Sequence, residues 1–144
     1  MQILVIDTNI VLDLFVFDDK AVRQLKAALE QGGLDWIATQ PMRDELERVL
    51  AYSHIQSRMV SYGVCAQDVL AGFDRHARLV DAPAKATVAC SDPDDQKFID
   101  LAVQHKCPLL SKDAAVLSMK KRLATLEVIA SAMMPVSSYT LIEP

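Results

Sequence analysis

The sequence predicts an α/β fold in which helices cover both faces of a central parallel β-sheet, a three-layer α/β/α arrangement. Two observations carry this prediction. Apolar runs of strand length alternate along the chain with segments whose apolar residues recur at helical spacing. The first run, residues 3–6, contains only branched aliphatic residues, which is typical of a strand buried on both faces of a parallel sheet. At 144 residues, the chain is expected to form a single domain, residues 1–144.

The individual elements follow from periodicity and from the residues that begin and end helices. Gly32 and Gly33 end an early helical segment, Pro41 suits the first turn of a later helix, and Gly63 interrupts a long helical middle. In chain order we expect a helix at 10–15, a helix at about 18–31, a strand at 34–39, a helix at 42–51, helical structure at 53–77, a strand at 78–81, a helix at 94–105, a strand at 107–111, a helix from residue 114 and a strand at 126–130.

Four acids from four distant segments are expected at one edge of this sheet. Asp7 directly follows the first strand, and Asp113 comes two residues after another strand. Glu45 and Asp95 lie in first turns of helices, and a helix that leads into a parallel strand begins at the carboxyl edge of the sheet. Open α/β sheets bind ligands at this edge. The positions therefore favour a functional cluster.

Each acid also has a structural explanation of its own. In the segment 92–95, the first aspartate can cap the following helix, proline suits the first helical position, and the last aspartate could complete a capping box. Asp113 could likewise cap the helix that begins after it. Glu45 lies near the apolar stripe of its helix, and it could pair with Arg43 or Arg48.

Carboxylates that are crowded together repel, and each raises the pKa of its neighbours unless a cation is present. A Mg²⁺ or Mn²⁺ ion with oxygen ligands would resolve this repulsion. We therefore expect Asp7, Asp95 and Asp113 to be metal ligands, with one carboxylate orienting or deprotonating an attacking water. Such ions stabilise in-line displacement at phosphorus. This chemistry would be hydrolysis of a phosphodiester.

Composition limits the other possibilities. A net charge of −4 argues against general adhesion to nucleic acid. A nucleic-acid substrate can still bind if the acids are concentrated in a metal pocket and the basic residues lie elsewhere. The three cysteines are expected to be buried free thiols, because their spacing fits no zinc site. Neither a membrane span nor a signal peptide is visible, so a cytoplasmic location is expected. A mean hydropathy of +0.17 suggests an oligomer, with residues 129–135 and the helical middle as candidate surfaces.

Several motifs together resemble those of the PIN-domain nucleases, in order and over nearly the whole chain. They are Val5-Ile-Asp7-Thr-Asn9, the acid of Glu45-Leu, Asp95-x-x-Phe98 with Ala102, and Leu110-Ser-Lys-Asp113. The form Asp92-Pro-Asp-Asp95 and the long helical middle resemble bacterial members described as toxins of toxin–antitoxin pairs.

This resemblance implies a PIN-like fold, metal-dependent cleavage of single-stranded RNA, a homodimer, and a protein antitoxin as a partner. It gives the family's acidic roles to Asp7, Glu45, Asp95 and Asp113, and its polar positions to Asn9 and Ser111. Asp92 is an additional acid, either a helix cap or an outer-shell ligand.

The sequence departs from the expectation for an RNA-binding protein, because it is acidic and has no basic arm. Candidate phosphate contacts are Lys112, Arg43 and the run at 120–122, although such a run is typical of a solvated helix face. Two alternative functions remain open. One is a PIN fold that binds RNA or metal without turnover. The other is a receiver-like module phosphorylated on aspartate, although Thr8 stands where its second adjacent acid would be expected.

Overall fold

The structure, a computed structural model, describes residues 1–134 and confirms the predicted α/β fold with a central parallel sheet. Every strand pairing in this sheet is parallel. The strand order across the sheet is β3-β2-β1-β4-β5. The strands are β1 (Gln2–Ile6), β2 (Leu34–Ala38), β3 (Ala77–Leu79), β4 (Leu109–Leu110) and β5 (Ala130–Ser131).

The strand order reverses beside β1. The chain runs outward from β1 to β2 and β3, and then returns to the other side of β1 to form β4 and β5. A reversal of this kind creates a crevice at the carboxyl ends of the two central strands. The backbone N–H of Asp7 donates to the carbonyl of Leu110 at 2.8 Å, so the ends of β1 and β4 lie side by side.

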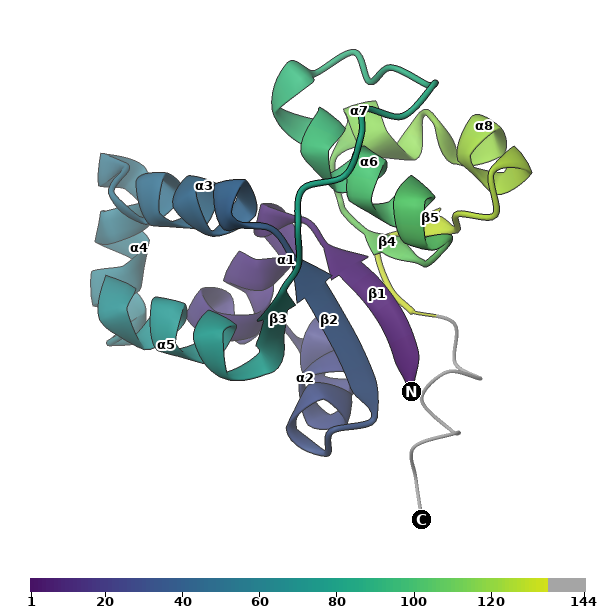
Figure 1. Cartoon of the computed structure of the whole chain (residues 1–144). Helices are drawn as coiled ribbons and strands as arrows, with labels where there is room; N and C mark the ends of the chain where they lie inside the picture. The colour runs from purple at the N-terminus through teal and green to yellow at the C-terminus, as the bar shows by residue number, and fades with distance from the viewer. Residues whose placement is uncertain (135–144) are drawn as a thin grey trace.

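Helices flank the sheet in two groups, one on each side (Figure 1). The first group contains α1 (Thr8–Leu12), the π-helical turn η1 (Asp13–Phe17), the 3₁₀ turn η2 (Lys20–Val22), α2 (Arg23–Glu30), α3 (Gln40–Leu50), α4 (Ser53–Tyr62) and α5 (Ala66–His76). The second group contains the 3₁₀ turn η3 (Pro93–Asp95), α6 (Gln96–His105), α7 (Ala114–Leu117) and α8 (Lys120–Thr125).

The core lies between these layers and the sheet. Leu4, Val5 and Ile6 of β1 are all buried, as expected for a central strand with helices on both faces. Trp36 of β2 packs edge-to-face against Phe73 of α5 at a centroid distance of 5.1 Å. This packing holds α5 against β2, the strand that pairs with β1 on one side.

Helix boundaries follow the predicted signals. Gly63 has a φ of +67° and ends α4, a left-handed conformation that glycine adopts without steric cost. Asp19 caps η2 by accepting a hydrogen bond from the backbone N–H of Ala21 at 2.9 Å. The helix predicted at 10–15 begins earlier, at Thr8, so it starts immediately after Asp7.

The last strand was predicted too early in the chain, at 126–130 instead of Ala130–Ser131. Leu126 belongs to the end of α8, where its N–H donates to the carbonyl of Leu123 at 2.9 Å. Glu127 then turns the chain with a φ of +64°. Pairing with β4 starts only at Ile129, whose carbonyl accepts from the N–H of Leu109. Local helical hydrogen bonds therefore override the apolar run.

The prediction of buried cysteines holds only for Cys107. All three cysteines are free thiols, but Cys90 is half-buried and Cys65 is exposed. Cys65 is the N-cap of α5, and its thiol hydrogen-bonds the carboxylate of Asp68 at 3.1 Å. Cys65 is exposed because it lies in the short surface turn between α4 and α5.

Among residues 1–134, no helix has the length and apolar character needed to cross a bilayer. The candidate interface segment 129–135 carries Ile129 and Met133, which are 58% and 53% exposed. Its last residue, Pro135, lies outside the described residues, as does the tail after it.

Candidate active site

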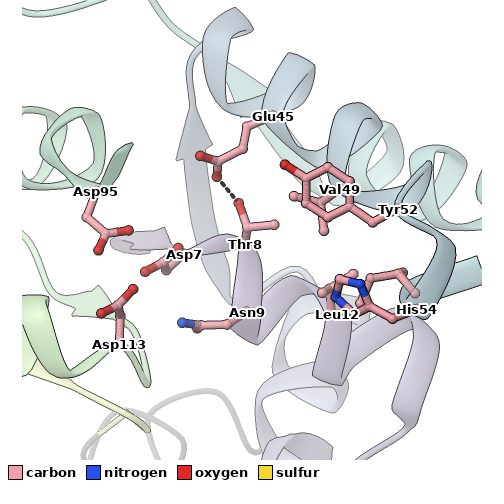
Figure 2. A pocket seen from close by; sticks show the side chains of 11 residues that line it. Asp7, Thr8, Asn9, Leu12, Glu45, Val49, Tyr52, His54, Asp95 and Asp113 are labelled. Carbon is pink, nitrogen blue, oxygen red and sulfur yellow. Dashed lines mark hydrogen bonds between the residues drawn. The ribbon is translucent and has the colours of Figure 1, made fainter. Parts of the chain in front are cut away.

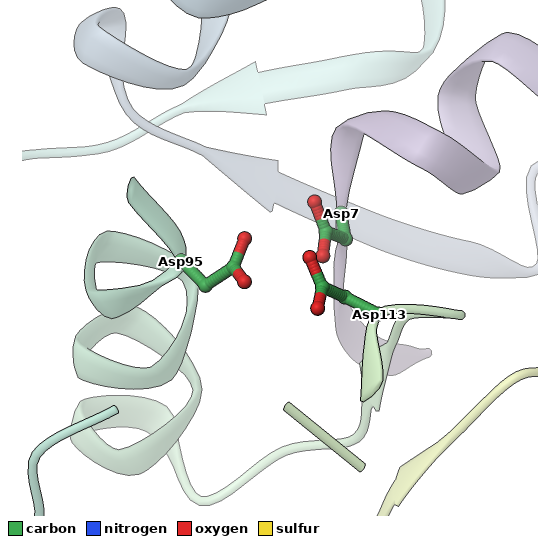
Figure 3. Close-up of side chains that lie close together, drawn as sticks. All are labelled: Asp7, Asp95 and Asp113. Atoms are coloured by element: carbon green, nitrogen blue, oxygen red, sulfur yellow. The ribbon is translucent and has the colours of Figure 1, made fainter. Parts of the chain in front are cut away.

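Three aspartates from separate elements meet at the crevice between β1 and β4. Asp7 follows β1, Asp95 ends η3, and Asp113 precedes α7. Each offers a carboxylate oxygen, and these three oxygens all lie within 4.8 Å of one another. All three residues line one cavity of about 320 Å³ (Figure 2), and their carboxyl groups point toward a common centre (Figure 3). We call this group the aspartate cluster.

Local structure explains how each carboxylate reaches this point. Asp7 is extended at the N-cap of α1 and leaves its carboxylate free for other partners. Asp113 caps α7, because its Oδ1 accepts from the N–H of Ala115 at 2.9 Å. Asp113 therefore caps a helix and belongs to the aspartate cluster at the same time. Asp95 does not form the capping box considered from the sequence; its side chain faces the other two acids (Figure 3).

Burial sets the electrostatics of the cluster. Asp7 and Asp95 are 4% and 6% exposed. Burial raises the pKa of Asp7 to about 6, although the Ser111 hydroxyl and a backbone hydrogen bond offset part of the rise. The pKa of Asp95 rises to about 8, because it is buried, contacts the Asp113 carboxyl and lies near the charge of Asp7. The cluster therefore resists carrying its full negative charge without a cation.

Two polar residues hold the aspartate cluster together. The Ser111 hydroxyl donates to Asp7 Oδ2 at 2.6 Å and accepts from the N–H of Asp113 at 3.0 Å. Asn9 Oδ1 accepts from the backbone N–H of Lys112 at 3.2 Å. These bonds join the loop after β1 to the loop after β4; they orient the Asp7 carboxylate and fix the backbone at Asp113.

Asp92 lies apart from the cavity lining and acts as a cap in this structure. Its Oδ1 accepts from the N–H of Asp94 at 2.9 Å and closes the first turn of η3. Of the two roles considered for Asp92, the contacts show the cap. By ordering η3, this cap helps to place Asp95.

Glu45 reaches the same cavity from α3, beside the aspartate cluster (Figure 2). Its Oε2 accepts a hydrogen bond from the Thr8 hydroxyl, and its Oε1 lies 2.7 Å from the amine of Lys97. The side chain is only 14% exposed. Glu45 is thus anchored to both α1 and α6, rather than to the arginines of its own helix.

Sequence reasoning did not identify two residues of this arrangement, Thr8 and Lys97. Thr8 was a visible candidate, because it has a hydroxyl directly after Asp7. The position of Lys97 gave no such signal, since its partner Glu45 is 52 positions away and on another helix. Lys97 also donates to the carbonyl of Asp94 at 2.6 Å, which fixes the amine close to η3.

The predicted phosphate contacts lie outside the lining of this cavity. Arg43 makes two hydrogen bonds to Asp74, at 2.8 and 2.9 Å, and is therefore already paired within the chain. The amine of Lys112 pairs with Asp13 at 2.5 Å, and its side chain is 46% exposed. Residues 120–122 begin α8 and are exposed, as expected for a solvated helix face.

The residues of the aspartate cluster fit a divalent cation. Asp95 Oδ2 is buried and has no hydrogen-bond partner among the described residues, a costly arrangement for a carboxylate unless another group satisfies it. Hard dications select oxygen donors of this kind. The donor set contains no sulfur or imidazole, so it matches Mg²⁺ or Mn²⁺ better than a softer ion.

Comparison with known proteins agrees with this geometry. A family model described as PIN domain matches residues 3–115. That range is well over half of the chain and contains all four acids of the cavity. No curated protein matches the chain significantly. From the extent of the family match, the chain belongs to the PIN-domain family, whose members are nucleases that generally use divalent metal ions.

Proposed function

We propose that this chain is a metal-dependent endoribonuclease that hydrolyses phosphodiester bonds of single-stranded RNA. The observation that supports the proposal most is the convergence of three carboxylates within 4.8 Å in a cavity that a fourth acid also lines. Without a cation this arrangement is electrostatically unfavourable. The family match favours this activity over a phosphoacceptor module.

We propose that Asp7, Asp95 and Asp113 hold Mg²⁺ or Mn²⁺. Asp7 and Asp113 are positioned by Ser111, and Asp95 presents a buried oxygen without a partner. A dication bound there would supply positive charge to the scissile phosphate and would lower the pKa of a coordinated water.

We assign Glu45 to the attacking water. Thr8 and Lys97 each occupy one of its oxygens, and each oxygen retains a second lone pair. Glu45 can therefore accept a hydrogen bond from water and then take its proton. The two anchors hold the carboxylate in one orientation, which is the condition for efficient proton transfer.

We keep Lys112 as a contact for substrate phosphate. Its side chain is 46% exposed, so a phosphate can contact the ammonium from the solvent side while the ion pair with the buried Asp13 carboxylate is kept. Arg43 suits this role less well, because two parallel hydrogen bonds to Asp74 hold its guanidinium. The substrate would then be positioned mainly by the cation rather than by a basic surface.

The direct test is cleavage of single-stranded RNA by the purified protein. Cleavage should require Mg²⁺ or Mn²⁺ and should stop with a chelator. Asp7→Asn and Asp95→Asn should each abolish it, whereas Asp81→Asn, which changes an exposed aspartate, should not. Retention of RNA without cleavage across several metals would instead support a binding protein. Wild-type rates in Asp7→Asn would refute the proposed chemistry.

We also propose that the chain acts in the cytoplasm as the toxin of a toxin–antitoxin pair, and that it forms a homodimer. Exposed apolar side chains on α4, Val60 at 80% and Tyr62 at 50%, support self-association. Expression of the wild-type chain should arrest growth, and Asp7→Asn should not. Gel filtration with light scattering should report twice the monomer mass; a monomer would refute the homodimer.

A further inference from the structure

The cavity that contains the aspartate cluster has a second end with a different character. There the lining is apolar and aromatic (Figure 2). In the view of the cavity, Thr8 and Glu45 lie between this end and Asp95. We call the following residues the apolar shelf: Leu12, Val49, Tyr52, His54 and Ile55.

The apolar shelf has a buried floor and an exposed rim. Leu12 and Ile55 are each 7% exposed and belong to the core that α1 and α4 share. Tyr52 is 48% exposed, although it is a large side chain, and His54 beside it is also exposed. Core packing accounts for the floor. It leaves about half of the Tyr52 surface in solvent, at the rim of the cavity that the acids also line.

The backbone holds the rim in place. Tyr52 lies in the turn between α3 and α4, where its N–H donates to the carbonyl of Val49 at 3.1 Å. Its ring stacks on the ring of His54, with centroids 5.9 Å apart and planes at 27°. The tyrosine therefore presents a supported aromatic face, and little conformational entropy is lost when a ligand contacts it.

We propose that the apolar shelf holds one nucleobase of a single-stranded nucleic acid whose phosphate lies at the aspartate cluster. A nucleotide joins a phosphate and a planar base through one sugar, and this cavity joins a cation-binding end and an aromatic end within about 320 Å³. That volume is in the lower range of small-ligand sites. Base stacking on aromatic side chains is the usual means of holding a single strand.

The inference rests on the proposed nuclease function and deepens it by giving a reason for single-strand selectivity. A base within a duplex is stacked between its neighbours, so it reaches the apolar shelf only after unpairing. Stacking on Tyr52 accepts any base, because every base has a π-face. The site should therefore discriminate strongly against duplex and only weakly among bases.

A binding experiment tests the apolar shelf without any cleavage. Uridine 5′-monophosphate, adenosine 5′-monophosphate and ribose 5-phosphate are titrated in Mg²⁺ by nuclear magnetic resonance. The wild-type protein should bind both nucleotides about 5- to 150-fold more tightly than the sugar phosphate. Tyr52→Ala should remove this preference and leave the sugar-phosphate affinity unchanged. Tyr52→Phe should retain it.

Tyr62→Ala is the matched control, because Tyr62 is 50% exposed and lies outside the cavity lining. It should keep the nucleotide preference. Circular dichroism melts verify that each variant is folded. A wild-type protein without the preference would overturn the inference. A nucleotide preference that survives in Tyr52→Ala would also overturn the inference. The apolar shelf would then be assigned to a side chain of a protein partner.

Cleavage assays separate this inference from the proposed function. The wild-type protein should cut single-stranded RNA with an abasic nucleotide beside the scissile phosphate more slowly than intact RNA. Tyr52→Ala should cut the abasic and the intact RNA at the same rate. If metal-dependent cleavage is normal and neither the abasic nucleotide nor Tyr52→Ala affects it, the base site is overturned and the nuclease function is not. Absence of cleavage together with a Tyr52-dependent nucleotide preference overturns the nuclease and supports the base site.

Discussion

Replacing Asp7 with asparagine should stabilise the metal-free protein at neutral pH while destroying the site. Asparagine has nearly the same shape, and its Oδ1 can still accept the hydrogen bond from Ser111. What it removes is a buried negative charge next to Asp113 and Glu45. Because this charge is costly without a cation, its removal favours the folded state.

The magnitude follows from proton linkage. The pKa of Asp7 is raised from 3.8 to about 6, so the folded chain binds this proton more tightly than the unfolded chain. The contribution of Asp7 to stability is therefore greatest below pH 3.8 and is lost as pH rises through the folded pKa. At about 1.4 kcal/mol per pKa unit, the loss is up to about 3 kcal/mol, or about 6–12 °C in Tm. Asp95 extends the fall toward pH 8.

The assay is urea denaturation followed by circular dichroism, in chelator, over a pH series. From acidic to neutral pH, the free energy of unfolding of Asp7→Asn should rise relative to that of the wild type by about 3 kcal/mol. Adding Mg²⁺ should stabilise the wild type by roughly 2.7 kcal/mol at a hundredfold excess over Kd, and should leave Asp7→Asn unchanged. Asp81→Asn should behave as wild type. A difference between the two proteins that does not change with pH, or a variant less stable than wild type at neutral pH, would refute the reasoning.

Two further predictions concern the residues that position the acids. Lys97→Met releases Glu45 Oε1 but changes no contact of the three aspartates of the cluster. The kcat should therefore fall about tenfold to a hundredfold, while the Mg²⁺ affinity measured by calorimetry stays unchanged. A parallel loss of Mg²⁺ affinity would contradict this assignment. Ser111→Ala removes the bond to Asp7 and leaves the N–H of Asp113 without its acceptor. Mg²⁺ affinity should fall about 10–100-fold, and unfolding free energy by about 1–3 kcal/mol; wild-type values for both would show that the hydroxyl has no positioning role.

Sequence periodicity predicted the architecture because burial of β1 on both faces leaves no polar alternation, a pattern with few alternatives. The convergence of Asp7, Asp95 and Asp113 was predictable for a related reason. Once the sheet is parallel, strand ends and helix starts share one edge, and the acids occupy those positions.

Features that depend on side-chain reach were not predictable. Nothing local distinguishes Lys97 from any other helix lysine; only tertiary packing of α6 against the rest of the fold brings it to Glu45. The same holds for Tyr52, which reads as an ordinary residue between helices until the cavity is seen. The late start of β5 reflects competition between helical hydrogen bonds at Leu126 and sheet pairing, which composition does not resolve.

The central claim is that three carboxylates remote in sequence share one divalent ion. Anomalous scattering from a crystal soaked in Mn²⁺ tests it most directly. We expect a peak about 2–2.5 Å from oxygens of Asp7, Asp95 and Asp113, and no such peak in Asp7→Asn. Manganese bound elsewhere, with these carboxylates turned apart or hydrogen-bonded to other groups, would contradict the account.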